Sequence, residues 1–262
     1  MGIFGRIFGG RPRKGGAPRG GGRDGDGGGG RDGKGRLAGM ETYMVVGLGN
    51  PGPRYAATPH NCGYMAVDAL AERIGGARWE TRFNAKVAAV SLSPGAGADE
   101  ARRLILLKPE TFMNDSGESV ARAVGWYKAS PERTVVVYDD VDLPPRSIRV
   151  RERGGPGTHN GMRSVVKALG TDGFPRVRIG IGRPGPGWDI KDYVLRRLGE
   201  CELGEYAQAF GDAAEAVLCV VRKGAAAAMN EWNGRGAGDG RAGREGDREE
   251  GRTEGRKNGR EG

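Results

Sequence analysis

Glycine is concentrated at the two ends of this 262-residue chain. Residues 1–40 hold 17 of the 51 glycines and residues 234–262 hold another 10, with few branched or aromatic side chains beside them. Segments of this composition bury too little apolar surface to offset the conformational entropy that folding removes. We therefore expect a disordered, Gly- and Arg-rich basic tail at 1–42, a disordered Gly-, Arg- and Glu-rich tail at 234–262, and one folded domain at 43–233 that is long enough for a sizeable core.

The formal net charge of +9 is also unevenly distributed. Residues 1–40 carry 9 Lys and Arg against 3 Asp, whereas residues 41–233 carry 25 basic and 23 acidic side chains. A surplus of arginine attracts RNA phosphates without sequence preference, and this attraction weakens as salt is added. The amino-terminal tail is therefore a candidate for weak, salt-dependent attraction to RNA, while the folded part is nearly balanced in charge.

The sequence argues against three classes of protein: membrane proteins, disulfide-rich proteins and zinc proteins. No apolar run reaches the roughly 18 residues that a membrane span requires, and the amino-terminal residues lack the apolar region of a signal peptide. The three cysteines, Cys62, Cys201 and Cys219, are isolated in the sequence, which supports neither a zinc module nor a disulfide framework. We expect a cytoplasmic protein with no membrane partner.

Short β-branched runs alternate with longer amphipathic stretches from residue 43 onward. Three consecutive valines at 135–137 indicate a buried central strand. Interleaved strands and helices are typical of an α/β domain, so we expect a single domain with a mixed, mostly parallel sheet of six or seven strands and helices on both faces. The expected strands are 43–48, 85–92, 103–107, 134–138, 147–151 and 176–181, and the expected helices are 62–75, 116–129, 161–169, 189–198 and 201–223.

The first strand is followed by a glycine pattern that resembles a dinucleotide-binding turn. Residues 47–52 read Gly-Leu-Gly-Asn-Pro-Gly. Such a turn must open directly into a helix, but Pro51 lies within the pattern and Pro53 and Pro59 follow it. The acidic residue about 20 positions on, Asp68, falls inside the expected helix. We therefore predict that these glycines allow a sharp turn that presents Asn50 at the carboxyl end of the strand, where open α/β sheets bind their ligands.

Polar loops follow other predicted strands as well. Residues 108–117 contain Asn114, and residues 139–145 begin with two aspartates. The two histidines of the chain, His60 and His159, each precede an asparagine in a loop. These polar residues are candidates for a ligand site at the strand ends. Helix capping explains the residues around Asn114 equally well, and turn formation explains the aspartates equally well.

Five motifs in this order and at this spacing resemble those of the bacterial-type peptidyl-tRNA hydrolases. The resemblance covers about 43–233, the whole expected domain, and does not extend to the tails. It implies hydrolysis, without metal or cofactor, of the ester between a peptide and the 3′-terminal ribose of a tRNA released from the ribosome, which recycles the tRNA. The motifs are Gly-Leu-Gly-Asn-Pro-Gly at 47–52, His-Asn-Cys-Gly at 60–63, Lys-Pro-Glu-Thr-Phe-Met-Asn-Asp-Ser-Gly at 108–117, Asp-Asp-Val-Asp-Leu-Pro-Pro at 139–145 and Gly-Thr-His-Asn-Gly at 157–161.

The resemblance assigns His60 as the general base that deprotonates an attacking water. Neutral imidazole suits this task because its unperturbed pKa lies near 6.5. Asp139 matches the position that hydrogen-bonds this histidine, selects its tautomer and stabilises the imidazolium. Asn50 and Asn114 match residues that bind substrate and water, and their amides can donate hydrogen bonds to an oxyanion.

Other matching positions contact the tRNA end, the peptide or the acceptor-stem phosphates. Aromatic rings suit stacking on terminal bases, and guanidinium groups pair with phosphates. Arg153, Arg163 and Arg176 are either further phosphate contacts or solvated charges. The positions that match substrate or tRNA contacts of the family are Tyr55, Phe112, Asn160, His159, Arg151 and Arg178. We expect the chain to bind peptidyl-tRNA as a monomer.

The sequence departs from the family pattern at Pro59, Pro156 and Thr158, which alter two loops and remove no catalytic candidate. Two alternative functions also fit the residues. A non-catalytic RNA-binding relative would keep the same surface without the chemistry, and release of an N-blocked amino acid from tRNA separates it from a hydrolase. A metal-dependent hydrolase would use the aspartates of 139–142, but no helical His-x-x-x-His spacing accompanies them, and a chelator would separate it.

Overall fold

The computed structural model describes residues 40–94 and 101–235. The predictions made for 1–39 and 236–262 lie outside the described residues. No helix among the described residues is long and apolar enough to cross a membrane. The first described strand begins at Thr42 and the last described helix ends at Trp232.

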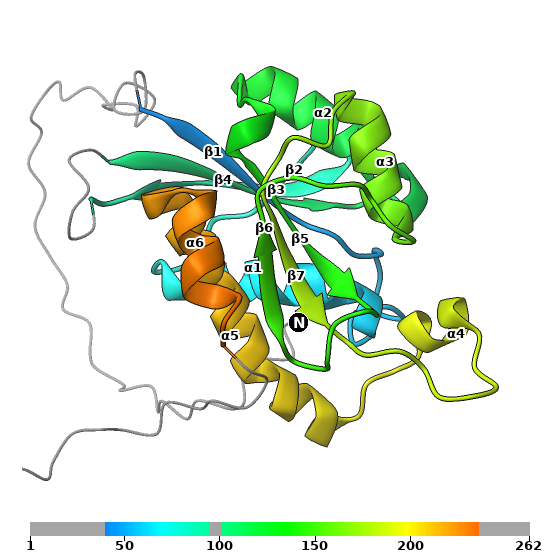
Figure 1. Cartoon of the computed structure of the whole chain (residues 1–262). Coiled ribbons are helices and arrows are strands. Elements are labelled where there is room, and N and C mark those ends of the chain that lie inside the picture. The colour runs from blue at the N-terminus through cyan, green and yellow to red at the C-terminus, as the bar shows by residue number, and fades with distance from the viewer. Residues whose placement is uncertain (1–39, 95–100, 236–262) are drawn as a thin grey trace, which may run out of the picture. The chain divides into compact units, whose positions relative to one another are not determined.

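Within the described part of the chain, seven strands form one sheet, in the order β2-β3-β4-β1-β5-β7-β6 (Figure 1). The four strands β4, β1, β5 and β7 are parallel, whereas β3 and β6 run antiparallel to their neighbours β4 and β7. The prediction of a mixed, mostly parallel sheet is confirmed. The strands are β1 (Thr42–Gly47), β2 (Glu80–Arg82), β3 (Ala85–Leu92), β4 (Arg102–Pro109), β5 (Thr134–Asp140), β6 (Ile148–Arg151) and β7 (Arg176–Gly180).

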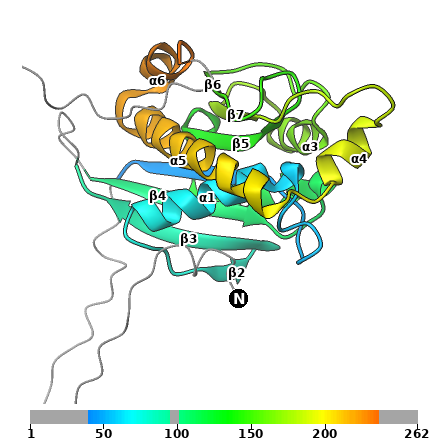
Figure 2. The same cartoon turned by 90° about the horizontal axis from the view of Figure 1, so that it is seen from below.

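Helices cover both faces of the sheet, as predicted (Figures 1 and 2). Alternate residues of a strand point to opposite faces, so Val45 packs in the core beneath α1, α5 and α6, while Met44 and Val46 pack in the core beneath α2 and α3. The helices are α1 (Cys62–Arg73), α2 (Ser116–Tyr127), α3 (Asn160–Leu169), α4 (Ile190–Leu195), α5 (Glu200–Lys223) and α6 (Ala225–Trp232), with short 3-10 turns η2 (Pro59–Asn61), η3 (Met113–Asp115) and η4 (Pro131–Arg133).

Two described elements, β2 and α6, were not predicted. β2 is only three residues long and mostly exposed, so it lacks the alternating apolar pattern that indicates a strand. α6 follows Gly224, whose φ of 89° interrupts the helical path after α5. The helix predicted at 189–198 is also shorter than expected, because the backbone becomes extended at Arg196.

Two facing glycines bring the start of α1 against the ends of β1 and β5. A Cβ on Gly47 would lie 2.3 Å from the carbonyl oxygen of Gly63, and a Cβ on Gly63 would lie 2.3 Å from the carbonyl oxygen of Val137. Any other residue at either position would force these backbones apart. The glycine pattern after the first strand thus allows close packing of helix and sheet, and this packing brings the turn η2 beside the end of β5.

Candidate active site

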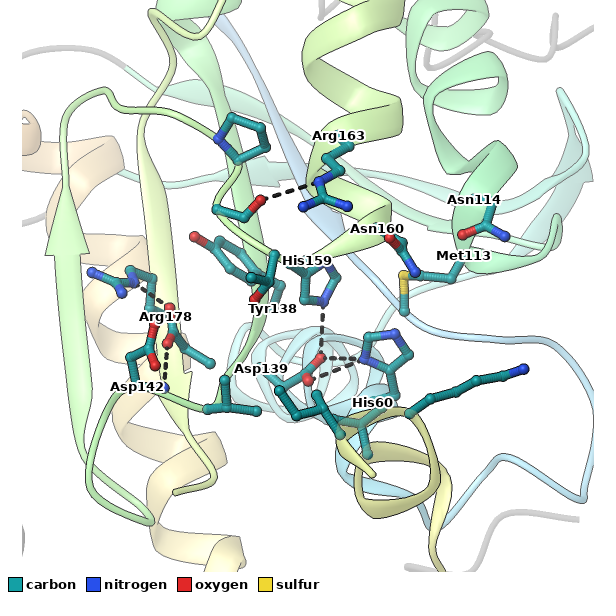
Figure 3. A pocket seen from close by; sticks show the side chains of 18 of the residues that line it. His60, Met113, Asn114, Tyr138, Asp139, Asp142, His159, Asn160, Arg163 and Arg178 are labelled. Carbon is teal, nitrogen blue, oxygen red and sulfur yellow. Dashed lines mark hydrogen bonds and ion pairs between the residues drawn. The ribbon is translucent and has the colours of Figure 1, made fainter. Parts of the chain in front are cut away.

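The loops at the carboxyl ends of the parallel strands surround a cavity of about 890 Å³ (Figure 3). All of the site residues predicted from the sequence line this cavity. They come from the β1 loop, the turns η2 and η3, the end of β5, the strands β6 and β7, and the start of α3. The sequence placed these residues on separate loops, and the sheet brings them together because the ends of parallel strands share one edge.

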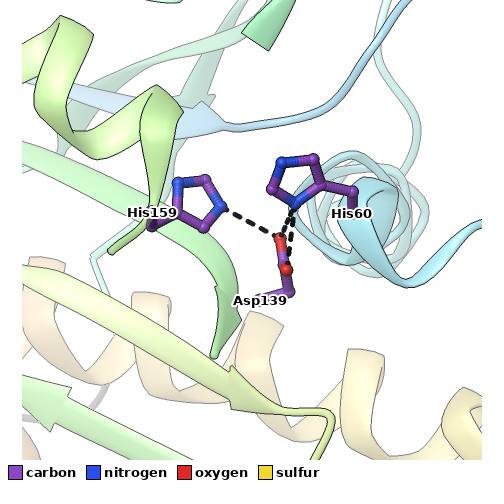
Figure 4. A group of neighbouring side chains, drawn as sticks. All are labelled: His60, Asp139 and His159. Carbon is purple, nitrogen blue, oxygen red and sulfur yellow. Dashed lines mark hydrogen bonds and ion pairs between the residues drawn. The ribbon is translucent and has the colours of Figure 1, made fainter. Parts of the chain in front are cut away.

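His60 and Asp139 form a buried pair at the centre of the cavity. Nδ1 of His60 lies 3.0 Å from each carboxylate oxygen of Asp139. A carboxylate can only accept, so Nδ1 carries the proton and Nε2 keeps a free lone pair. Figure 4 shows the Asp139 carboxylate directed at the imidazole of His60, which comes from the turn η2.

Burial and charge act in opposite directions on this pair. Burial lowers the pKa of His60, but the adjacent Asp139 charge and its hydrogen bond raise the pKa above 6.5 overall. Burial raises the pKa of Asp139, but the charges of and hydrogen bonds from the two histidines lower it well below its usual range. Asp139 is therefore a carboxylate near neutral pH, and it favours the protonated form of His60.

The second histidine, His159, lies on the other side of the same carboxylate (Figure 4). Its Nε2 is 3.1 Å from Oδ1 of Asp139, and its Nδ1 accepts a hydrogen bond from the backbone N–H of Met162 at 3.2 Å, which caps α3. The ring of Tyr138 packs edge-on against the His159 ring, with centroids 4.9 Å apart. Both nitrogens of His159 thus have protein partners.

Asn50 is held rigidly by its neighbours. Its backbone N–H donates to Oδ1 of Asn61, and its backbone carbonyl accepts from Nδ2 of Asn61, both at 2.9 Å. Its side-chain Oδ1 accepts from the backbone N–H of Met113 at 2.9 Å. The Asn50 side-chain NH2 is the group left to donate into the cavity. Asn61 was not among the predicted site residues, although its place directly after His60 was a signal.

Direct hydrogen bonds link the donor atoms around Asp139. Among the described residues, His60, Asp139 and His159 form a cluster of ligand-type atoms that lie within 4.8 Å of one another. However, the histidine nitrogens lie 3.0–3.1 Å from the carboxylate oxygens, which is direct hydrogen-bond distance. The nearby Asp140 pairs instead with Arg178, and Asp142 pairs with Arg183. Each of the three aspartates thus has a protein partner without a metal ion, and the chelator experiment tests the metal-dependent alternative.

The arginines of the cavity fall into two groups. Arg151, Arg153 and Arg163 are exposed at the rim, and Arg178 is half-buried with its Nε 2.6 Å from Oδ2 of Asp140. Arg176 was predicted to be either a phosphate contact or a solvated charge, and its burial fits neither. It is 2% exposed, because its guanidinium donates to backbone carbonyls of the glycine-rich loop and of the segment before β7, at Gly154, Gly155, Asp172 and Phe174.

Two further parts of the cavity wall are apolar. Tyr55 and Phe112 meet edge to face with centroids 6.4 Å apart, and Phe112 is 59% exposed. The other part comes from α4, whose residues were not predicted as site residues because their sequence shows only helical periodicity and no motif. The apolar α4 residues that line the cavity are Ile190, Val194 and Leu195, and Lys191 lines it beside them.

Comparisons with known proteins point to one family. A sequence model of the peptidyl-tRNA hydrolases matches residues 44–239. A peptidyl-tRNA hydrolase of Symbiobacterium thermophilum is 48% identical over 190 residues, which cover 72% of this chain and 98% of that protein. One of Chloroflexus aurantiacus is 46% identical over 192 residues, which cover 73% and 98%. The crystal structure of peptidyl-tRNA hydrolase from Acinetobacter baumannii matches with a TM-score of 0.64 and 34% identity, over 75% of this chain and 97% of that chain.

Proposed function

Because this chain belongs to the peptidyl-tRNA hydrolase family and hydrolyses peptidyl-tRNA, we propose that it cleaves the ester between peptide and tRNA by water attack, with His60 as the general base. The observation that supports this role best is the buried pair of His60 and Asp139 in the cavity at the strand ends.

The direction of proton transfer follows from the tautomer of His60. Since Nδ1–H donates to Asp139, the lone pair of Nε2 accepts a proton from water. The resulting hydroxide attacks the ester carbonyl carbon and forms a tetrahedral oxyanion. When this intermediate collapses, the ribose 3′-oxygen leaves and takes the proton back from Nε2–H. The products are a tRNA with a free 3′-hydroxyl and a peptide carboxylic acid, which releases its proton to solvent and becomes a carboxylate.

Asp139 and the two asparagines stabilise the charges that develop in this reaction. The Asp139 carboxylate is 2% exposed, so its attraction for protonated His60 is weakly screened by water. The free NH2 of Asn50 and the amide of the exposed Asn114 can donate to the oxyanion. General-base assistance of this kind contributes about 10²–10⁴-fold to the rate.

The rim of the cavity supplies the contacts for the tRNA. Exposed guanidinium groups suit the acceptor-stem phosphates, and the exposed Phe112 with Tyr55 offers rings on which the terminal bases stack. Asp140 pairs with Arg178, so Arg178 must exchange this carboxylate for a phosphate when tRNA binds. The proposed phosphate contacts are Arg151, Arg178, Arg153 and Arg163, and Asn160 is proposed to contact the tRNA end or the peptide.

The remaining organisation of the protein is also part of the proposal. The catalytic domain spans 43–233, and it acts as a cytoplasmic monomer on peptidyl-tRNA. The tails at 1–42 and 234–262 contribute no group to the chemistry, because the residues that line the cavity lie between Asn50 and Leu195. The basic amino-terminal tail adds salt-dependent attraction to RNA.

Release of the amino acid from N-acetyl-aminoacyl-tRNA, compared with unblocked aminoacyl-tRNA, tests the proposed function. We expect rapid release from the blocked substrate, much slower release from the free one, and no change on addition of a chelator. An RNA-binding protein without catalysis would bind both tRNAs and release neither amino acid. Loss of activity with the chelator would favour the metal-dependent alternative.

A further inference from the structure

The mechanism above uses one of the two histidines that contact Asp139. His159 approaches the same carboxylate from the start of α3, and its ring centroid is 4.8 Å from that of His60. Oδ1 of Asp139 lies within hydrogen-bond distance of both rings, whereas Oδ2 lies near His60 only. The two imidazoles therefore share Oδ1 of Asp139 as a hydrogen-bond acceptor.

The hydrogen bonds of His159 define its tautomer. Nδ1 accepts from the backbone N–H of Met162, so it must carry a lone pair, and the ring proton is on Nε2, which donates to Asp139. A doubly protonated ring would lose the cap of α3, because it has no acceptor. His159 is thus a donor to Asp139 with a fixed orientation, and both of its nitrogens already have protein partners.

Other charged and titratable groups surround the pair of His60 and Asp139. The turn η2 packs against β5, α1 and α4. β5 contributes Asp139 and Asp140, of which Asp140 is paired with Arg178. α1 contributes the buried thiol of Cys62, and α4 and the residue before it contribute Lys191 and Asp189 to the cavity wall. In addition to these groups, His159 at the start of α3 donates directly to the carboxylate of Asp139.

We propose that His159 is a positioning residue, which fixes the Asp139 carboxylate through Nε2–H and limits how strongly that carboxylate holds a proton on His60. The proposal rests on the function proposed above, in which His60 must be neutral to accept a proton from water. A hydrogen bond to Oδ1 withdraws charge from the carboxylate, so protonated His60 is stabilised less than it would be by Asp139 alone. His159 thereby keeps more of the enzyme in the active, neutral form near neutral pH.

Two substitutions separate the contacts of His159. Asparagine places an oxygen where Nδ1 of histidine lies, so His159→Asn keeps the cap of α3 and removes the donor to Asp139. Glutamine places an NH2 near the position of Nε2, so His159→Gln keeps the donor and removes the cap. Each variant is thus the control for the other.

The full-length protein is well suited to a direct test because it contains only 2 histidines. With ¹⁵N-labelled histidine, NMR reports the tautomer and titration midpoint of each ring, and kcat/KM on N-acetyl-aminoacyl-tRNA is measured over the same pH range. In His159→Asn we expect the His60 midpoint and the acid limb of kcat/KM to rise together by about half a pH unit, with KM within about twofold of wild type. In His159→Gln both stay at the wild-type pH, while the melting temperature falls by about 2–4 °C from loss of the cap.

Specific results would overturn the inference. A structural role predicts the reverse order, with His159→Asn unchanged and His159→Gln impaired. A substrate-binding role predicts a higher KM in both variants and an unchanged His60 midpoint. If the midpoint shifts as expected but the wild-type protein releases no amino acid, then the contact between the rings and Asp139 stands and the proposed function fails.

Discussion

Replacement of Asp139 with asparagine is expected to leave the cavity intact and to slow catalysis severely. In the structure His159 donates to Oδ1, so the amide oxygen of the new side chain is retained at that position. The amide NH2 then takes the place of Oδ2, which lies 3.0 Å from Nδ1 of His60. The retained oxygen at Oδ1 also lies 3.0 Å from Nδ1, so the amide N–H weakens the preference for a proton on Nδ1 and raises the share of the tautomer protonated on Nε2, which cannot accept a proton from water.

The magnitude follows from the lost charge. Two unit charges about 4 Å apart attract by about 4 kcal/mol at the effective dielectric of a protein site. If the imidazolium in the transition state loses this attraction, kcat falls by about a thousandfold, and the wrong tautomer adds to the loss. Because Asp139 is what raises the pKa of His60 against the effect of burial, the acid limb of kcat/KM moves to lower pH in Asp139→Asn.

Single-turnover rates on N-acetyl-aminoacyl-tRNA between pH 5 and 9 measure both effects. The double variant His60→Ala/Asp139→Asn is the control, and it should be hardly slower than His60→Ala because the two residues act as one unit. A loss in Asp139→Asn below tenfold, an acid limb at the wild-type pH, or losses that multiply in the double variant would refute the reasoning.

The same substitution tests the stability that the pair contributes. The pKa of His60 is raised above 6.5 in the folded protein, so its contribution is complete below that pH and is lost as the pH rises through the folded value. The pKa of Asp139 is lowered from 3.8, so its contribution is present above that pH and is lost as the pH falls through the folded value. The melting temperature of wild type should therefore exceed that of Asp139→Asn most between about pH 4 and 6.5, and a difference independent of pH would contradict the pairing.

Three other perturbations probe the tRNA contacts, the fold and the tails. Arg151→Ala and Arg178→Ala should each raise KM for full-length peptidyl-tRNA far more than for a minimal 3′-terminal ester, and equal losses on both would place these arginines in the chemistry or the fold. Gly63→Ala should lower the melting temperature by several degrees or prevent folding, because its Cβ would lie 2.3 Å from a backbone oxygen, and a stable variant would show that this approach is not tight. Deletion of 1–40 and 234–262 should leave kcat within tenfold of wild type at moderate salt, whereas a larger loss would show that a tail enters the site.

The fold and the site differ in how far the sequence predicts them. The valine strand at 135–137 and its parallel partners follow from apolar patterns that only a covered sheet accommodates. β2 and α4 could not be predicted fully, because the pairing and the limits of short elements depend on their neighbours rather than on their own residues. At the site, the family resemblance implied a hydrogen bond between His60 and Asp139, but the distance between them is a property of the sheet and of the packing of Gly47 against Gly63.

The roles of individual side chains were the hardest to predict. Arg176 has the same residue type as Arg178 and lies two positions away, yet it is buried against backbone carbonyls. His159 was grouped with the substrate contacts, and only the geometry shows that both of its nitrogens have protein partners. A motif identifies which residue types are present, whereas the partners of each atom determine what the residue can do.

The central claim is that His60 removes the proton from the water that cleaves the ester. The most direct measurement is the single-turnover release of N-acetyl-amino acid by His60→Ala, with binding of the same tRNA measured on the same preparation. The account predicts binding close to that of wild type and a rate lower by about 10²–10⁴-fold, with the acid limb of the pH profile lost. A rate within tenfold of wild type, or a loss that lies in binding alone, would contradict it.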